Sequence, residues 1–143
     1  MDLELFRYTE QCLREYHENL ALVKQRRCER NNLPMFSDPS PYRVQGGGIS
    51  EPVAIQCLRL EDLDAEIARL DGRTAPITLG LETVGQKTIY RPLLARYFEG
   101  KGWKEVASEL KCSRSRVEKI RLEFVRIFAK LLLNSWRTER TGR

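Results

Sequence analysis

The side chains best suited to contact a nucleic acid lie close together near the end of the chain. Arg114 and Arg116 can each donate two hydrogen bonds to the O6 and N7 atoms of a guanine. Ser115 and Lys119 suit acceptors on bases or phosphates, and a helix N-terminus adds backbone N–H groups for a phosphate. We therefore expect duplex DNA to contact Ser113, Arg114, Ser115, Arg116, Glu118, Lys119, Arg121 and Lys104.

Two short amphipathic helices would have to position these side chains. The first has apolar residues at helical spacing, namely Trp103, Val106, Ala107 and Leu110. Lys111 and Cys112 then form a turn, and Ser113 is a good N-cap for the second helix. Its apolar stripe is Val117, Ile120, Phe124, Ile127 and Leu131. This pattern predicts a helix-turn-helix, in which the second helix enters the major groove.

The distribution of charge favours the same part of the chain. The whole protein has 25 Lys and Arg residues against 20 Asp and Glu residues, a formal net charge of +5. Residues 99–143 contain twelve basic and six acidic residues, which gives +6, whereas residues 50–73 contain three and six, which gives −3. Only the basic part can attract a polyanion.

The sequence gives little support for enzyme chemistry or for a cofactor. Its single histidine, His17, has no nucleophile motif around it, and no phosphate-binding glycine motif is present. The consecutive glycines 46–48 suit a linker better than a phosphate cradle. Cys12, Cys28, Cys57 and Cys112 form no CxxC pair, so we expect neither a zinc site nor disulfides. No signal peptide and no apolar run of membrane-spanning length is present, and we expect a reduced, cytoplasmic, soluble protein.

The remaining segments predict an all-α protein with two parts. One long helix is expected from Asp2 to about Asn31, followed by an irregular loop over Leu33 to Gly48. A second helix is expected from an N-cap at Ser50 to Gly72. Residues 1–73 would then be a helical hairpin or coiled coil, 74–87 a linker, and 88–143 the DNA-binding domain. Pro92 would lie in the first turn of a helix that closes at Gly100 and Gly102, or would kink it.

Both N-terminal helices have a narrow apolar stripe with a seven-residue repeat. The repeats are Phe6, Leu13 and Leu20 in the first helix and Val53, Leu60 and Ile67 in the second. The two helices can satisfy each other within one chain, or four helices from two chains can form a bundle. Because two helices do not enclose a core, we expect a homodimer.

The last helix is longer than DNA recognition requires. Its extra turns form a broad apolar surface, made of Ile127, Phe128, Leu131, Leu132, Leu133 and Trp136. This surface must be buried within the chain, against another subunit, or against a partner such as RNA polymerase.

The last third of the chain resembles region four of bacterial sigma factors, in the stretch RYFEGKGWKEVASELKCSRSRVEKIRLEFVRIFAKL. It is more similar to the short sigma-like regulators of phages and prophages of the ArpU and RinA type, above all in RYFEGKGW. The earlier layout, a long charged helix, a Pro/Gly loop ending near ISEPVA and a second helix, is similar to that group in architecture only.

The resemblance implies a sequence-specific regulator that acts on phage late genes, with RNA polymerase as a partner. It makes Trp103 to Leu110 the supporting helix and Ser113 onward the recognition helix. Two positions depart from the family. Lys111 stands where Gly is usual, and a non-Gly residue at positive φ costs on the order of 1 kcal/mol. Glu118 replaces a residue that is often basic in sigma factors, so the preferred DNA sequence need not be theirs.

Two other functions fit the same pattern. A small terminase subunit, which packages phage DNA, also combines a helix-turn-helix with oligomerising helices. A structural helical adaptor that binds no nucleic acid would need only the paired helices.

Overall fold

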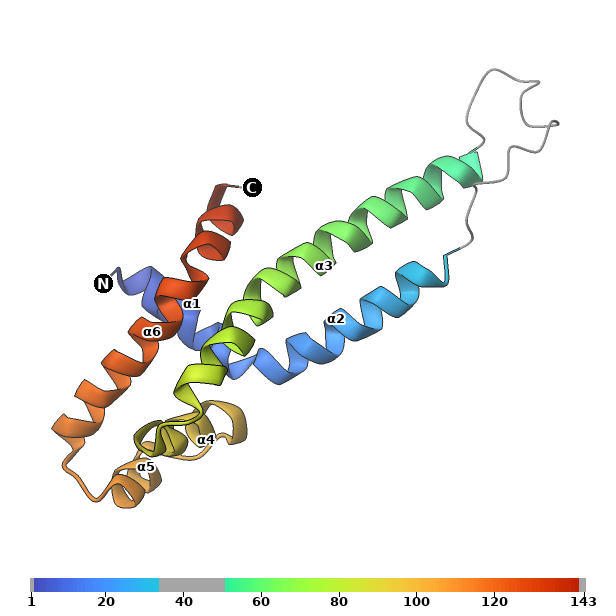
Figure 1. Cartoon of the computed structure of the whole chain (residues 1–143). Coiled ribbons are helices and arrows are strands. Elements are labelled where there is room, and N and C mark those ends of the chain that lie inside the picture. The colour runs from blue at the N-terminus through green and yellow to red at the C-terminus, as the bar shows by residue number, and fades with distance from the viewer. Residues whose placement is uncertain (1, 34–50, 142–143) are drawn as a thin grey trace.

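The computed structural model describes residues 2–33 and 51–141, and within them the secondary structure is helical (Figure 1). The helices are α1 (Leu3–Arg14), α2 (Tyr16–Asn31), α3 (Glu51–Val84), α4 (Arg91–Glu99), α5 (Trp103–Leu110) and α6 (Arg114–Thr141), with a 3₁₀ turn, η2, at Thr88–Tyr90. The expected all-α class is therefore confirmed. The predicted N-cap at Ser50 and the glycines 46–48 lie outside the described residues. No helix of the described part has enough length and apolar character to cross a membrane.

The first predicted helix is two helices, and the expectation of a single one is wrong. Glu15 separates α1 from α2 with φ −92° and ψ 2°. Neither glycine nor proline causes the break. Instead, α1 packs on α6 while α2 packs along α3, so the two segments must follow different directions (Figure 1). Tyr16 fixes the start of α2, because its ring is buried and its hydroxyl lies 2.7 Å from that of Thr78.

The second predicted helix does not end at Gly72, and residues 74–84 are not a linker. α3 continues through Gly72 and Pro76 to Val84. A proline inside a helix leaves the carbonyl four residues earlier without its N–H donor, and here that carbonyl belongs to Gly72. The hydroxyl of Ser135 on α6 donates to it at 2.6 Å. A hydrogen bond from another helix thus replaces the one that Pro76 removes.

Glycine allows α3 and α6 to approach closely. A Cβ atom at Gly80 would lie 2.6 Å from Cε1 of Phe128 and 3.1 Å from Cδ1 of Leu131. The side chains of Phe128 and Leu131 on α6 therefore pack directly on the backbone of α3. This contact buries part of the broad apolar surface expected on α6: Phe128, Ala129 and Leu132 are buried within the chain.

The protein has a body and a projecting arm. The body consists of α1, α4, α5, α6 and the second half of α3, and the arm consists of α2 beside the first half of α3 (Figure 1). Leu63, Ile67 and Leu70 of α3 are buried along this pairing. Ion pairs join the arm helices along its length: Arg26 to Glu66 at 3.1 Å, Arg27 to Asp71 at 2.6 Å, and Arg30 to Asp64.

One apolar core joins the two ends of the chain. Cys12 and Leu13 of α1 and Ile77 and Val84 of α3 pack in the same cluster as Phe124 of α6. The burial of Cys12 raises the pKa of its thiol to about 11, so this cysteine stays protonated and packs as an apolar side chain. The segment 88–143 therefore shares its core with α1 and α3.

We expect Ser135→Ala to lower the free energy of unfolding by about 1–2 kcal/mol, because it leaves the Gly72 carbonyl without a donor. Thr138→Ala is the matched control. Its hydroxyl donates to the Asn134 carbonyl on the exposed side of the same helix. There a backbone N–H and water can donate to that oxygen when the hydroxyl is removed. Urea denaturation of both variants measures the difference, and equal losses would contradict the role given to Ser135.

Candidate nucleic-acid interface

α4, α5 and the start of α6 form a compact three-helix unit at one end of the body (Figure 1). Pro92 lies in the first turn of α4, where a missing N–H costs nothing, so it does not kink the helix. Gly100 ends α4 in the left-handed conformation, with φ 77°. Both features agree with the expectations from the sequence.

The turn between α5 and α6 has the hydrogen bonds of a Schellman motif. The N–H of Lys111 donates to the Ser108 carbonyl at 3.2 Å, and the N–H of Cys112 donates to the Ala107 carbonyl at 3.3 Å. Lys111 has φ 54° and ψ 44°, so this lysine does occupy the left-handed position where Gly is usual. Cys112 and Ala107 both pack against the core, which supplies the apolar contact of the motif.

Ser113 begins α6 as the sequence predicts. Its Oγ accepts a hydrogen bond from the N–H of Arg116 at 3.4 Å, and its carbonyl accepts from the N–H of Val117 at 3.1 Å. The apolar residues expected in the core lie there: Val106, Val117 and Ile120 are buried, and Ala107, Leu110 and Cys112 are half-buried against them. The turn and the stripe together fix which side of α6 faces outward.

Most of the predicted DNA-contacting residues are exposed, at the start of α6 and, for Lys104, on α5. The exposed members of the set are Lys104, Ser113, Arg114, Ser115, Arg116, Glu118 and Lys119. Within the described residues, Lys104, Arg114, Arg116 and Lys119 form no ion pair, whereas Arg26, Arg27 and Arg30 of the arm are paired with carboxylates. The start of α6 thus combines unpaired cations with a helix N-terminus, which is the charge distribution that an anion requires.

Arg121 is the member of the predicted set that the structure turns away from this surface. Its Nη2 donates to Oε2 and Oε1 of Glu10 at 2.7 and 2.9 Å, and its Nε donates to Oε2 at 3.1 Å. Its guanidinium carbon also lies 5.2 and 5.0 Å from the ring centroids of Phe6 and Trp103. Arg121 is therefore held inside the protein rather than presented to a ligand.

The carboxylate of Glu10 also accepts a hydrogen bond of 2.6 Å from the hydroxyl of Tyr97. Burial and the hydrogen bond to Glu10 raise the pKa of Tyr97. Burial opposes the charge of Arg121, but its hydrogen bonds with Glu10 and Tyr97 outweigh this and raise the pKa of the guanidinium. The tyrosine therefore stays neutral and the arginine stays charged at any physiological pH.

Two further sets of residues lie at this site and were not among those expected from the sequence. Arg126 and Lys130 are exposed on α6 and follow Lys119 by seven and eleven residues, so helical spacing alone places them on the same side. Glu10 and Tyr97 could not be found in this way, because their partner Arg121 lies 111 residues from Glu10 along the chain. No local pattern signals such a pairing.

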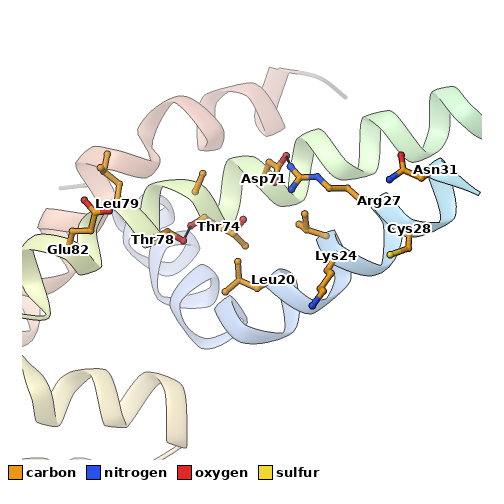
Figure 2. Close-up of a pocket in the computed structure, with 12 residues that line it drawn as sticks. Leu20, Lys24, Arg27, Cys28, Asn31, Asp71, Thr74, Thr78, Leu79 and Glu82 are labelled. Carbon is orange, nitrogen blue, oxygen red and sulfur yellow. Dashed lines mark hydrogen bonds and ion pairs between the residues drawn. The ribbon is translucent and has the colours of Figure 1, made fainter.

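A groove lies along the arm of the protein. One groove of about 610 Å³ runs between α2 and α3, and Figure 2 shows the Arg27–Asp71 ion pair across it and Leu20 and Leu79 along it. It contains no nucleophile beside a histidine, since His17 packs its ring on Tyr16 and Phe98 instead. The described residues also contain no group of side chains that could hold a metal ion.

Comparisons with protein-family models, with curated proteins and with solved structures find no match to this chain. The function must therefore be argued from the residues and their geometry.

We expect Lys111→Gly to raise the free energy of unfolding by about 0.5–1 kcal/mol. The substitution removes a left-handed penalty of roughly 1–2 kcal/mol, and the greater backbone entropy of glycine in the unfolded chain offsets part of that gain. Lys104→Gly loses the same charge from an exposed, right-handed position of α5, and should instead cost about 0.5–1 kcal/mol. Opposite signs in thermal denaturation support the strain at Lys111, and a loss in both variants would argue against it.

Proposed function

We propose that this protein is a sequence-specific DNA-binding transcription regulator of the phage late-gene type, acting with RNA polymerase in a bacterial host. The observation that carries the proposal is the set of unpaired cations on the exposed start of α6, a helix begun by a capped turn after α5. An α-helix fits the major groove, and Arg side chains in its first two turns reach guanine edges there. The resemblance of the last third to sigma region four supports the same function.

The arm supports a second copy of the chain as the partner. Leu20 and Leu79, on the groove between α2 and α3, are 38% and 57% exposed, and Leu60 on α3 is 36% exposed (Figure 2). Leu13 of the same heptad is fully buried in the body and cannot take part. Two arms packed together would cover these leucines and place two recognition helices on one operator.

A small terminase subunit is the alternative that the same features allow. It differs in assembly, since packaging subunits form rings of many chains around or beside the DNA. The number of chains bound to each duplex therefore separates the two functions.

The full chain should bind duplex DNA with a strong dependence on salt. If Lys and Arg neutralise about five phosphates, the logarithm of the binding constant should fall against that of the salt concentration with a slope of roughly −4 to −5. Selection from random duplexes at moderate salt would give the operator, and fluorescence anisotropy would give the slope. Sedimentation in the same buffers should find two chains per operator. A slope near zero, or no selected sequence, would refute the proposal, and a large ring would favour the terminase.

Arg114 and Arg116 should contribute to the choice of DNA sequence, whereas Lys104 should contribute to binding of any duplex. A bidentate Arg–guanine contact contributes about 1–3 kcal/mol of discrimination, so Arg114→Ala or Arg116→Ala should relax the preference at one base pair. Lys104→Ala should weaken all duplexes alike and make the salt slope shallower by about one. Repeating the selection with each variant tests this, and a uniform loss of binding from all three would rule out base reading by these arginines.

A further inference from the structure

We infer that Glu10, on the N-terminal helix α1, is a positioning residue for the recognition helix α6. It acts through the hydrogen bonds that its carboxylate accepts from Arg121 of that helix. This inference rests on the proposed function, because it concerns how the DNA-reading side chains are aimed. Glu10 itself contacts no ligand, since the side chain is only 9% exposed.

Arg121 is restrained by several groups at once. Phe6 and Trp103 both pack against its guanidinium, at 5.2 and 5.0 Å from the guanidinium carbon to the ring centroids. Glu10 occupies one edge through hydrogen bonds of 2.7–3.1 Å, and Glu118 accepts from Nη1 at 3.2 Å. Such a group cannot rotate or slide without breaking several contacts at once.

The restraint comes from three other helices. Phe6 and Glu10 belong to α1, and Trp103 belongs to α5. Tyr97 of α4 donates to the same Glu10 carboxylate at 2.6 Å, and its ring packs edge-on to Trp103 at 6.1 Å. Arg96 of α4 covers Trp103 as well, at 5.0 Å. A single carboxylate therefore joins α1, α4 and α6. We call the contacts of Arg121 with Phe6, Glu10 and Trp103 the clamp.

The position of Arg121 on α6 makes this grip relevant to recognition. At 3.6 residues per turn, Arg121 lies about 200° around the helix from Lys119 and, two turns away, on nearly the same side as Arg114, so its contacts fix the rotation of the helix that carries both cations. A rotation of about 20° moves a point at a side-chain radius of roughly 5–6 Å by about 2 Å. A hydrogen bond tolerates only about 0.5 Å. Without the clamp, α6 could stay helical and still miss the base edges.

The test uses the full chain with Glu10→Gln, which keeps the shape and removes the charge. Its probes are the duplex selected by the unmodified protein and the same duplex with single base-pair changes. We expect the ratio of the affinity for the selected duplex to that for the changed duplex to fall about tenfold. A tenfold change is within the discrimination that one or two base contacts provide. Glu4→Gln is the matched control, because Glu4 pairs with Arg140 on the same two helices but is exposed and forms no hydrogen bond with Arg121 or Tyr97.

A purely structural role would lower the folded fraction and weaken every duplex alike, leaving the ratio unchanged, and that result would overturn the inference. If Glu10→Gln does not fold, Tyr97→Phe decides, because it removes one hydroxyl donor and leaves the Arg121–Glu10 pair in place. We expect a smaller fall in the ratio for Tyr97→Phe, and an unchanged ratio would count against the clamp.

A readout without DNA separates this inference from the proposed function. The chain has two tryptophans, so Trp136→Phe leaves Trp103 as the only one. In that background, Glu10→Gln should change the emission of Trp103 while circular dichroism keeps its helical signal, and Glu4→Gln should change neither. If the unmodified protein selects no duplex but Trp103 responds, the proposed function fails and the clamp stands. An unchanged Trp103 emission would remove the clamp itself.

Discussion

The buried carboxylate of Glu10 is the constraint on which the arrangement of the body depends. An ionised carboxylate away from water is costly unless donors surround it, and removing one partner of such a pair leaves an uncompensated charge. Glu10 meets this requirement with donors from α4 and α6. Because these donors come from separate helices, the low-energy state of the carboxylate exists only when α1, α4 and α6 have their observed positions. Replacing the group with an apolar one could stabilise the protein as well, but would not define those positions as narrowly.

The same constraint explains the break in the first helix. α1 must remain on α6 to keep Glu10 beside Arg121, and the start of α6 also packs on α5. α2 instead follows α3, where its arginines find Glu66, Asp71 and Asp64. One straight helix cannot satisfy both surfaces. Arg73 of α3 lies at the junction, with Glu15 at 3.5 Å and Glu139 of α6 at 2.9 Å.

Local chemistry was enough to predict the turn and the caps of the candidate site. The capping hydroxyl of Ser113 depends on neighbours within a few residues, as does Pro92, which was expected either in the first turn of a helix or at a kink. The positive φ of Lys111 was expected from the resemblance to sigma region four, where Gly is usual at this position. The predictions that were wrong depended on distant partners. Pro76 favours a helix end when only its neighbours are considered. In the structure Ser135 donates to the Gly72 carbonyl, and no local sequence pattern indicates that donor. Arg121 reads as one more basic residue of α6 until Glu10 is known to lie against it.

The basic residues of this chain therefore fall into two populations that composition cannot separate. Arg26, Arg27 and Arg30 of the arm, and Arg121, have carboxylate partners, so they fix helices against each other and contribute little to the external field. Those at the start of α6 have none within the described residues, so their field extends into solvent. A net charge of +5 would be a weak argument for a polyanionic ligand if it were spread evenly. It becomes a stronger one because residues 99–143 have an excess of six positive charges, and the cations at the start of α6 form no ion pair within the described residues.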